Sequence, residues 1–186
     1  MADAAPTRMS VEVFLDWQTR QGELYELVDG RPVPRGMTGA TQRHDRVVTN
    51  AIVALASRLR GGPCWPMTAD IAVRTRARSL RRPDVTVQCV PLDPNAAVAS
   101  EPVLVLEVLP PSTERIDTIV KLDEYKALAS LRHILIAEPD TPHVLLYSRG
   151  EDGRWTGLDH IGPDTELDLP AIGCTIPIAE LYDGVS

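Results

Sequence analysis

Residues 103–109 read Val-Leu-Val-Leu-Glu-Val-Leu, and this stretch decides the fold. Six of its seven positions are apolar, and polar and apolar residues do not alternate. Such a run is typical of a strand whose two faces are both covered by other elements. Pro110 and Pro111 end the run, and a helical pattern over about 114–130 follows. We therefore expect a sheet with this strand in its interior and helices packed on it.

Helical and strand patterns recur on both sides of this central strand. Ser10 is placed to cap a helix that carries Val13, Phe14 and Trp17 on one side. Residues 24–33 predict a hairpin that turns at Asp29-Gly30, and the apolar period over 41–60 predicts a long helix. Further strands are predicted at 67–74, 85–90, 133–137, 144–147 and 155–160, with a loop over 91–99 and a short helix near 178–182. The predicted fold class lies between α+β and α/β, with a mixed central β-sheet flanked by helices.

Composition limits the classes of protein that the chain can represent. Its 186 residues, 44% hydrophobic and 24% charged, suffice for one domain over 9–186 after a disordered tail at 1–8. No apolar run approaches the roughly 18 residues of a membrane span, and the N-terminus lacks a signal-peptide layout. A cytoplasmic protein is therefore expected, with Cys64, Cys89 and Cys174 as reduced thiols.

Two acidic residues stand at positions where a charge is costly. Asp84 begins a predicted strand, and Glu107 interrupts the most apolar one. A buried carboxylate needs a cation, a proton or hydrogen-bond partners to offset its lost hydration. If the two strands are neighbours, both carboxylates can serve Mg²⁺, which prefers hard oxygen ligands. The alternative is that Asp84 caps a turn and Glu107 pairs with an arginine.

Basic residues near these acids are candidate partners. Asp117, Lys121 and Tyr125 recur at intervals of four, so they share one face of the helix after Glu107. Lys121 could then reach back towards a metal, although a surface pair with Asp117 explains the spacing equally well. Five arginines precede Asp84 at positions 74, 76, 78, 81 and 82. They are compatible with a local grip on DNA, despite a net charge of −7 that argues against a general nucleic-acid coat, or with a solvated hairpin.

Taken in order, these motifs resemble the Uma2-like restriction endonuclease family of the PD-(D/E)XK nuclease superfamily. The resemblance runs through nearly the whole chain. It is carried by the segments Tyr25-Glu26-Leu27-Val28-Asp29-Gly30, Arg82-Pro83-Asp84-Val85 and 104–113, together with His44, Asp117, Lys121 and Tyr125.

The resemblance implies a restriction-endonuclease-like core and a role for each matching residue. Asp84 and Glu107 are implied to bind Mg²⁺ or Mn²⁺ with the backbone carbonyl of Val108, and Glu26 and His44 are implied to lie at the same site. The superfamily's usual lysine, two residues after the glutamate, is Leu109 here. The resemblance transfers its role to Lys121 on the following helix, with Asp117 and Tyr125 in support.

The hypothesis from sequence is therefore a metal-dependent DNA endonuclease. Arg74, Arg76, Arg82 and His44 are expected to contact phosphate, and a homodimer is expected from the resemblance. The rival hypothesis is a catalytically inactive nuclease-fold module that binds DNA or protein. The sequence has no zinc-ligand spacing, and without a glycine-rich phosphate loop it implies no nucleotide cofactor.

Overall fold

The computed structural model describes residues 8–35, 41–109 and 115–185. In chain order its elements are α1 (Val11–Gln18), β1 (Tyr25–Val28), β2 (Arg31–Pro34), α2 (Gln42–Leu59), β3 (Trp65–Thr68), β4 (Ala72–Arg76), β5 (Ser79–Arg81), β6 (Val85–Gln88), β7 (Val98–Ala99), β8 (Pro102–Val108), α3 (Arg115–Lys126), β9 (His133–Ala137), β10 (His143–Arg149), β11 (Trp155–Ile161), β12 (Glu166–Leu169), the 3₁₀ turn η1 (Pro170–Ile172), β13 (Cys174–Pro177) and α4 (Ile178–Leu181). The predicted tail at 1–8 lies outside the described residues except for Arg8, and so do the predicted strand end at Pro110 and Pro111.

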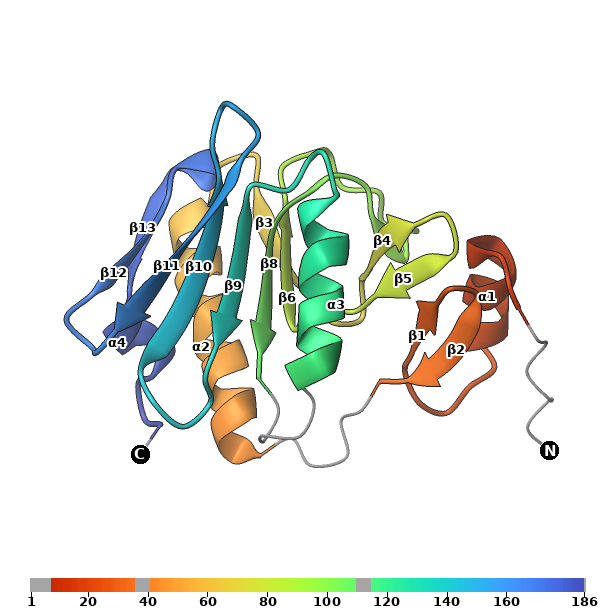
Figure 1. The fold of residues 1–186 in the computed structure, drawn as a ribbon, viewed down its shortest axis with the longest axis horizontal. Coiled ribbons are helices and arrows are strands. Elements are labelled where there is room, and N and C mark those ends of the chain that lie inside the picture. Colours follow the sequence, from red (N-terminus) through yellow and green to blue (C-terminus); the bar gives the residue numbers. More distant parts are fainter. Residues whose placement is uncertain (1–7, 36–40, 110–114, 186) are drawn as a thin grey trace.

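A six-stranded mixed sheet forms the centre of the molecule, in the order β11-β10-β9-β8-β6-β3. Its β8–β9 pair is parallel, and its other pairs are antiparallel. Helix α3 lies on one face of this sheet and α2 on the other (Figure 1). The expected mixed sheet flanked by helices is confirmed, and β8 occupies the interior position that its apolar run predicts. No helix in the described ranges is long and apolar enough to cross a membrane.

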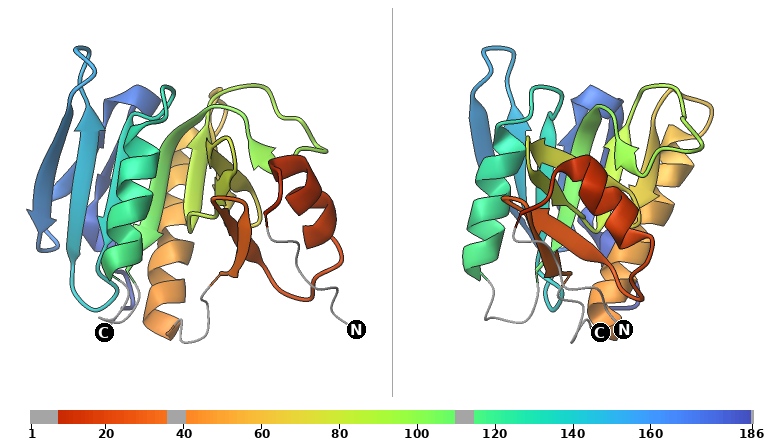
Figure 2. Two further views of the ribbon diagram at one scale, coloured as in Figure 1. Left: turned by 45° about the vertical axis from the view of Figure 1, so that its right-hand side comes forward. Right: turned by 90° about the vertical axis from the view of Figure 1, so that its right-hand side faces the viewer.

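A second sheet, in the order β2-β1-β5-β4-β7, lies beside the first and carries α1 (Figure 2). Phe14 and Trp17 of α1 pack with Leu27 and Leu80 in a core of their own. Met9 also belongs to this core, and its backbone N–H donates to the Gly30 carbonyl at 2.6 Å. The hairpin β1–β2 is therefore held from the N-terminal side as well as by the sheet.

Local signals place the ends of these elements where the sequence predicts them. The Ser10 hydroxyl accepts from the Val13 N–H at 3.2 Å at the start of α1. Asp29 and Gly30 have φ angles of 48° and 83°, the left-handed conformation that a tight hairpin turn requires. The Thr41 hydroxyl caps α2 by accepting from the His44 N–H at 3.3 Å. This cap fixes the start of α2, so His44 lies in its first turn.

Two parts of the predicted topology need correction. The single strand expected over 67–74 is two strands in different sheets, because the chain turns where the Ile71 N–H donates to the Thr68 carbonyl at 3.1 Å. The hairpin β12–β13, which the sequence analysis does not anticipate, packs Leu167, Leu169 and Ile176 into the same core as α2. Its strands are only four residues long, which is too short for a clear alternating pattern.

The prediction of three reduced thiols is wrong for two of them. Cys64 and Cys89 form a disulfide, and Cys174 is free. Trp65 pairs with Gln88 in the antiparallel β3–β6 ladder, so the residues just outside this pair, Cys64 and Cys89, stand opposite each other. Sequence spacing could not show this, since the two cysteines are 25 residues apart.

The disulfide is expected to stabilise the fold by closing this loop in the unfolded chain. Reduction should lower the free energy of unfolding by about 3.5 kcal/mol, the entropic contribution from closing a loop of this length. Denaturant titrations with and without reductant measure the difference, with Cys174→Ser as the control that should behave like the parent chain. If alkylation of the denatured, unreduced protein labels all three cysteines, the pairing is refuted.

Candidate active site

The register of β6 and β8 brings two acidic residues together. Val85 pairs with Leu106, so Asp84, just before β6, stands opposite Glu107 on β8. The next N–H along β8, that of Val108, donates to Asp84 Oδ2 at 2.8 Å. Directly opposite residues have Cβ atoms roughly 5 Å apart. The condition set by the sequence, that the two strands be neighbours, is therefore met.

Two cationic side chains surround the Asp84 carboxylate. Arg35 Nη2 lies 2.6 Å from Oδ1, and His44 Nε2 lies 3.5 Å from Oδ2. Burial favours the neutral carboxyl group, but the His44 contact, the Val108 N–H and Arg35 together hold the pKa of Asp84 below its usual value. Burial likewise disfavours a charged imidazole, yet Asp84 raises the pKa of His44 above 6.5. Asp84 is thus held as a carboxylate.

The pKa of Glu107 is shifted in the opposite direction to that of Asp84, although both side chains are mostly buried; that of Glu107 is 12% exposed. Burial is the largest cause that raises the pKa of Glu107; Lys121 opposes it, the charges of Asp84 and Glu26 add to it, and the net pKa is about 7. The Tyr125 hydroxyl donates to Glu107 Oε1 at 2.6 Å, and Lys121 Nζ lies 3.6 Å from the same oxygen. Near neutral pH this carboxylate is therefore short of positive charge, a condition that a bound cation would relieve.

Glu26 links the lysine to a buried arginine. Lys121 Nζ lies 3.1 Å from Glu26 Oε1, and Arg81 Nη1 donates to Oε2 at 3.0 Å. Burial alone would raise the pKa of Glu26, but Lys121, the Arg82 N–H and Arg81 lower it. Glu26 is therefore an anion, and it holds the Lys121 ammonium close to Glu107.

Helix α3 presents its functional side chains through a second buried ion pair. Glu124 accepts from Arg81 Nε at 2.9 Å and from the Thr75 hydroxyl at 2.7 Å. Its side chain is 2% exposed, as is that of Arg81. Because Lys121 and Tyr125 share the adjoining face of α3, this contact fixes the rotation that directs both towards Glu107. Asp117 lies in the same helix, but its side chain is outside the described residues.

The predicted DNA-contacting arginines separate into two groups. Arg74 and Arg76 are exposed on β4. Arg82 is 3% exposed, and its guanidinium donates to the backbone carbonyls of Tyr25, Ala69 and Asp70. The expected phosphate contact of Arg82 stays a prediction, and in this structure its side chain instead fastens β1 to the turn before β4.

The oxygen donors at this site fit a hard divalent cation. They are the carboxylates of Asp84 and Glu107 and the carbonyl of Val108. Mg²⁺ is usually held by one or two carboxylates, with waters and phosphate oxygens completing six ligands. Within the described ranges, no three His, Cys, Asp or Glu side chains converge on one point. The donor set suits a cation that keeps several waters, and it does not suit zinc.

Three residues of this site escape the sequence analysis or are given no role there. Arg35 follows a short edge strand, and Glu124 reads as one more charge on a polar helix. Arg81 reads as part of a solvated basic run. All three residues of β5 are buried, so alternation along this short strand gives no signal that would have distinguished Arg81.

A mixed sheet with paired carboxylates on adjacent strands, flanked by helices, defines a restriction-endonuclease-like fold. Residues 11–179 match the family model "Uma2: Putative restriction endonuclease", and the chain belongs to that family. An uncharacterized protein of Synechocystis is 29% identical over 181 residues, which are 96% of this chain and 94% of the relative. A crystal structure described as a "putative nuclease" of Anabaena variabilis superposes with a TM-score of 0.73 at 16% identity, covering 96% of this chain and 99% of its own. That likeness shows a shared fold.

The raised pKa of Glu107 predicts that this residue destabilises the metal-free protein above neutral pH. Between the ordinary value of 4.5 and about 7 the folded chain binds more protons than the unfolded chain, so stability falls as pH rises through this window. In EDTA at pH 8, Glu107→Gln should raise the free energy of unfolding by up to about 3 kcal/mol. At pH 4.5 the gain should vanish.

Denaturant titrations at the two pH values check this expectation. Glu101→Gln, at an exposed position beside the same strand, is the matched control and should change little. Equal effects of Glu107→Gln at pH 4.5 and pH 8 would show that Glu107 titrates normally.

Proposed function

We propose that this chain is an endonuclease that hydrolyses DNA phosphodiester bonds with Mg²⁺ or Mn²⁺. The observation that carries the proposal is the place of Lys121, whose ammonium lies 3.6 Å from Glu107 Oε1 although it comes from a different element. A lysine that served only the surface would point to solvent, whereas this side chain is 14% exposed. A buried ammonium next to Glu107, which faces Asp84 on the adjacent strand, is an arrangement that suits metal-assisted phosphate chemistry.

The two acidic residues and the main chain hold the cation in this proposal. Asp84, Glu107 and the Val108 carbonyl supply its protein ligands. When bound, the metal lowers the pKa of a ligated water and neutralises charge that develops on the phosphate. The Tyr125 hydroxyl, which donates to Glu107 at 2.6 Å, fixes the orientation of that carboxylate.

Lys121 orients the attacking water and stabilises negative charge on it. Its position is set by Glu26, and Arg81 in turn holds Glu26, so the ammonium needs little reorganisation when substrate binds. Burial opposes the charged form of His44, but Asp84 raises its pKa, and in its charged form the imidazole can donate to a phosphate oxygen. These groups come from several elements: Glu26 from β1, His44 from α2, Arg81 from β5 and Lys121 from α3.

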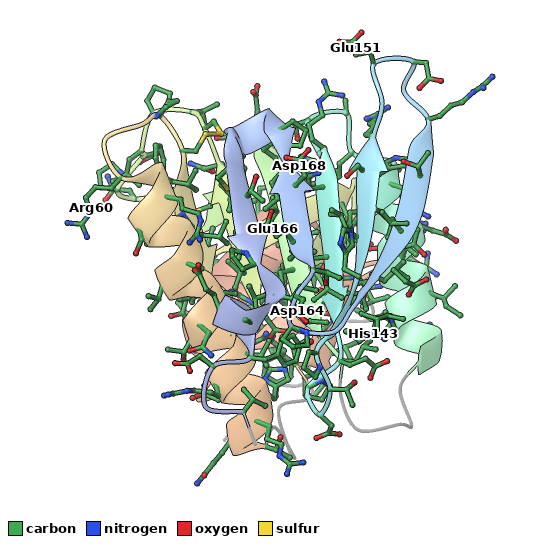
Figure 3. All side chains as sticks on the ribbon, turned by 90° about the vertical axis from the view of Figure 1, so that its left-hand side faces the viewer. Arg60, His143, Glu151, Asp164, Glu166 and Asp168 are labelled. Carbon is green, nitrogen blue, oxygen red and sulfur yellow. A yellow bond between two sulfur atoms is a disulfide. The ribbon has the colours of Figure 1, made fainter. Side chains whose placement is uncertain are left out.

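Surface charge restricts where DNA can approach. Asp164, Glu166 and Asp168 follow one another along the hairpin β12–β13 (Figure 3), and all three are exposed. This acidic row repels phosphate, so DNA is expected to avoid that face. Arg74 and Arg76, exposed on β4, are proposed as backbone contacts. A homodimer would supply one site for each strand of a duplex.

A non-catalytic DNA- or protein-binding module is the second candidate function. Leu109 stands where the superfamily's usual lysine would be, and Asp84 already has a cationic partner in Arg35 at 2.6 Å. Both observations would suit a site that no longer turns over. The two candidates differ in whether the chain cleaves DNA: the endonuclease needs Asp84 and Glu107 for cleavage, whereas the binding module does not cleave.

Cleavage of supercoiled plasmid distinguishes the candidates. The purified chain should nick the plasmid with Mg²⁺ or Mn²⁺ and not with EDTA, while Glu107→Gln and Asp84→Ala, purified identically, should be inactive. Glu101→Gln should nick at the parental rate, because its side chain is exposed and remote from the paired carboxylates. Nicking that persists in Glu107→Gln would refute the assignment of Glu107 as a metal ligand needed for cleavage.

The role of Lys121 has its own test. Lys121→Met should slow single-turnover cleavage by about 10²–10³-fold, because a preorganised charge at the reacting centre is lost. The matched control is Lys126→Met on the same helix, where the ammonium stacks over the Tyr147 ring and does not contact the acidic residues of the site. Comparable rates in the two variants would contradict the proposed role.

A further inference from the structure

Arg35 is the cation nearest to Asp84, and the sequence patterns give it no role. Its Nη2 lies 2.6 Å from Asp84 Oδ1, against 3.5 Å for His44 Nε2. Its backbone N–H donates to the Leu24 carbonyl at 2.9 Å, so the main chain is fixed at the end of the β1–β2 hairpin. Its side chain is 10% exposed. The backbone of Arg35 is therefore anchored, and its mostly buried guanidinium contacts Asp84, a proposed metal ligand.

Other cations crowd this guanidinium. Burial is the largest cause that opposes the charged forms of His44 and Arg82, and the charge of Arg35 adds to it in both cases; Asp84 outweighs these causes at His44, whose pKa is raised, while the pKa of Arg82 is lowered. The three side chains are therefore close enough to repel one another, and Asp84 is the anion that contacts both Arg35 and His44. If a divalent metal bound Asp84, Arg35 and His44 would lose their shared counter-ion and would favour a new anion.

The guanidinium has donors to offer such an anion. Within the described part of the chain, its side-chain hydrogen bond runs from Nη2 to Asp84, which leaves Nε and Nη1 for a second acceptor. A guanidinium can hold a phosphate through two parallel N–H···O bonds, and it is always charged. Phosphate oxygens of DNA are the anions that the proposed function brings to this point.

We propose that Arg35 is a substrate-binding residue: it holds Asp84 in the metal-free protein and transfers to a phosphate of bound DNA when a divalent metal takes its place. This inference rests on the proposed nuclease function and names a residue that contacts the substrate. It makes Arg35 and the metal competitors for one carboxylate. DNA, by drawing Arg35 away, then strengthens metal binding, and the metal strengthens DNA binding by the same factor.

Two measurements on the full chain test this exchange without relying on cleavage. The first follows the melting temperature against Mg²⁺ concentration without DNA. Arg35→Met should tighten the apparent Mg²⁺ affinity about fivefold, because the competing cation is gone. The second measures binding of a labelled duplex by fluorescence anisotropy in Ca²⁺, with a gel to verify that the DNA stays intact. Arg35→Met should weaken DNA binding about fivefold and reduce the salt slope by about one.

Arg31→Met is the matched control, since Arg31 lies exposed on the same hairpin and the substitution removes the same charge. It should leave the Mg²⁺ affinity unchanged and affect DNA binding less than Arg35→Met. Arg35→Lys keeps the charge without the two-pronged geometry and should give intermediate values for both quantities. Arg35→Lys also replaces Arg35→Met as the test variant if Arg35→Met does not fold.

The outcomes separate the inference from the function on which it rests. Tighter Mg²⁺ binding together with weaker DNA binding supports the exchange. Tighter Mg²⁺ binding with unchanged DNA affinity overturns it, because Arg35 is then a counter-ion only. Unchanged Mg²⁺ affinity overturns it as well. If the parent chain and Arg31→Met both fail to bind DNA while Mg²⁺ still shifts the melting temperature, the nuclease proposal itself has failed, and the DNA contact with it.

Discussion

The repulsion between the carboxylates of Asp84 and Glu107, which stand opposite each other in the register of β6 and β8, is the constraint on which the rest of the site depends. Water screens such a repulsion at a protein surface, but here both side chains are almost wholly enclosed. Three basic side chains from the surrounding elements offset this repulsion: Arg35 after β2, His44 on α2 and Lys121 on α3. The second sheet and both long helices are thus tied electrostatically to one strand pair.

Burying these charges costs hydration free energy, and this cost explains the buried network of Arg81, Glu26 and Glu124. An ammonium or a guanidinium removed from water is stable only when good geometry and further hydrogen bonds offset its lost hydration. Arg81 meets this condition through Glu26 on β1 and Glu124 on α3, and it is 1% exposed. In this position it joins two strands of the second sheet, β1 and β5, to the helix that carries Lys121. The network thereby sets the orientation of the site as well as satisfying its charges.

Most of the fold could be predicted from local patterns, and the failures have physical causes. The apolar run at 103–109, the Asp29-Gly30 turn and the cap at Ser10 each contain their structural meaning within a few residues. The Cys64–Cys89 pair and the division of 67–74 between two sheets depend on strand register, which a single sequence does not encode locally. The β12–β13 hairpin is too short to show a period.

The candidate site divides in the same way. The places of Asp84, Glu107 and Lys121 follow from their positions in strong patterns, and the structure brings them together. Arg35 and Glu124 find their partners across 49 and 43 residues, through contacts that leave no periodic trace. The burial of Arg81 and Arg82 is hidden for a related reason: a run of arginines suggests a solvated surface, whereas acceptors on distant segments hold these two side chains inside the protein.

Crystals grown with Mn²⁺ above pH 7.5 give the most direct test that Asp84 and Glu107 together hold a divalent metal. The account predicts an anomalous peak at roughly 2.0–2.3 Å from one oxygen of each carboxylate, the usual range for hard cations of this size, with the Arg35 guanidinium displaced from Asp84. A map with no peak there and with Arg35 still on Asp84 would contradict the account, because the carboxylate pair would then be a structural salt-bridge site.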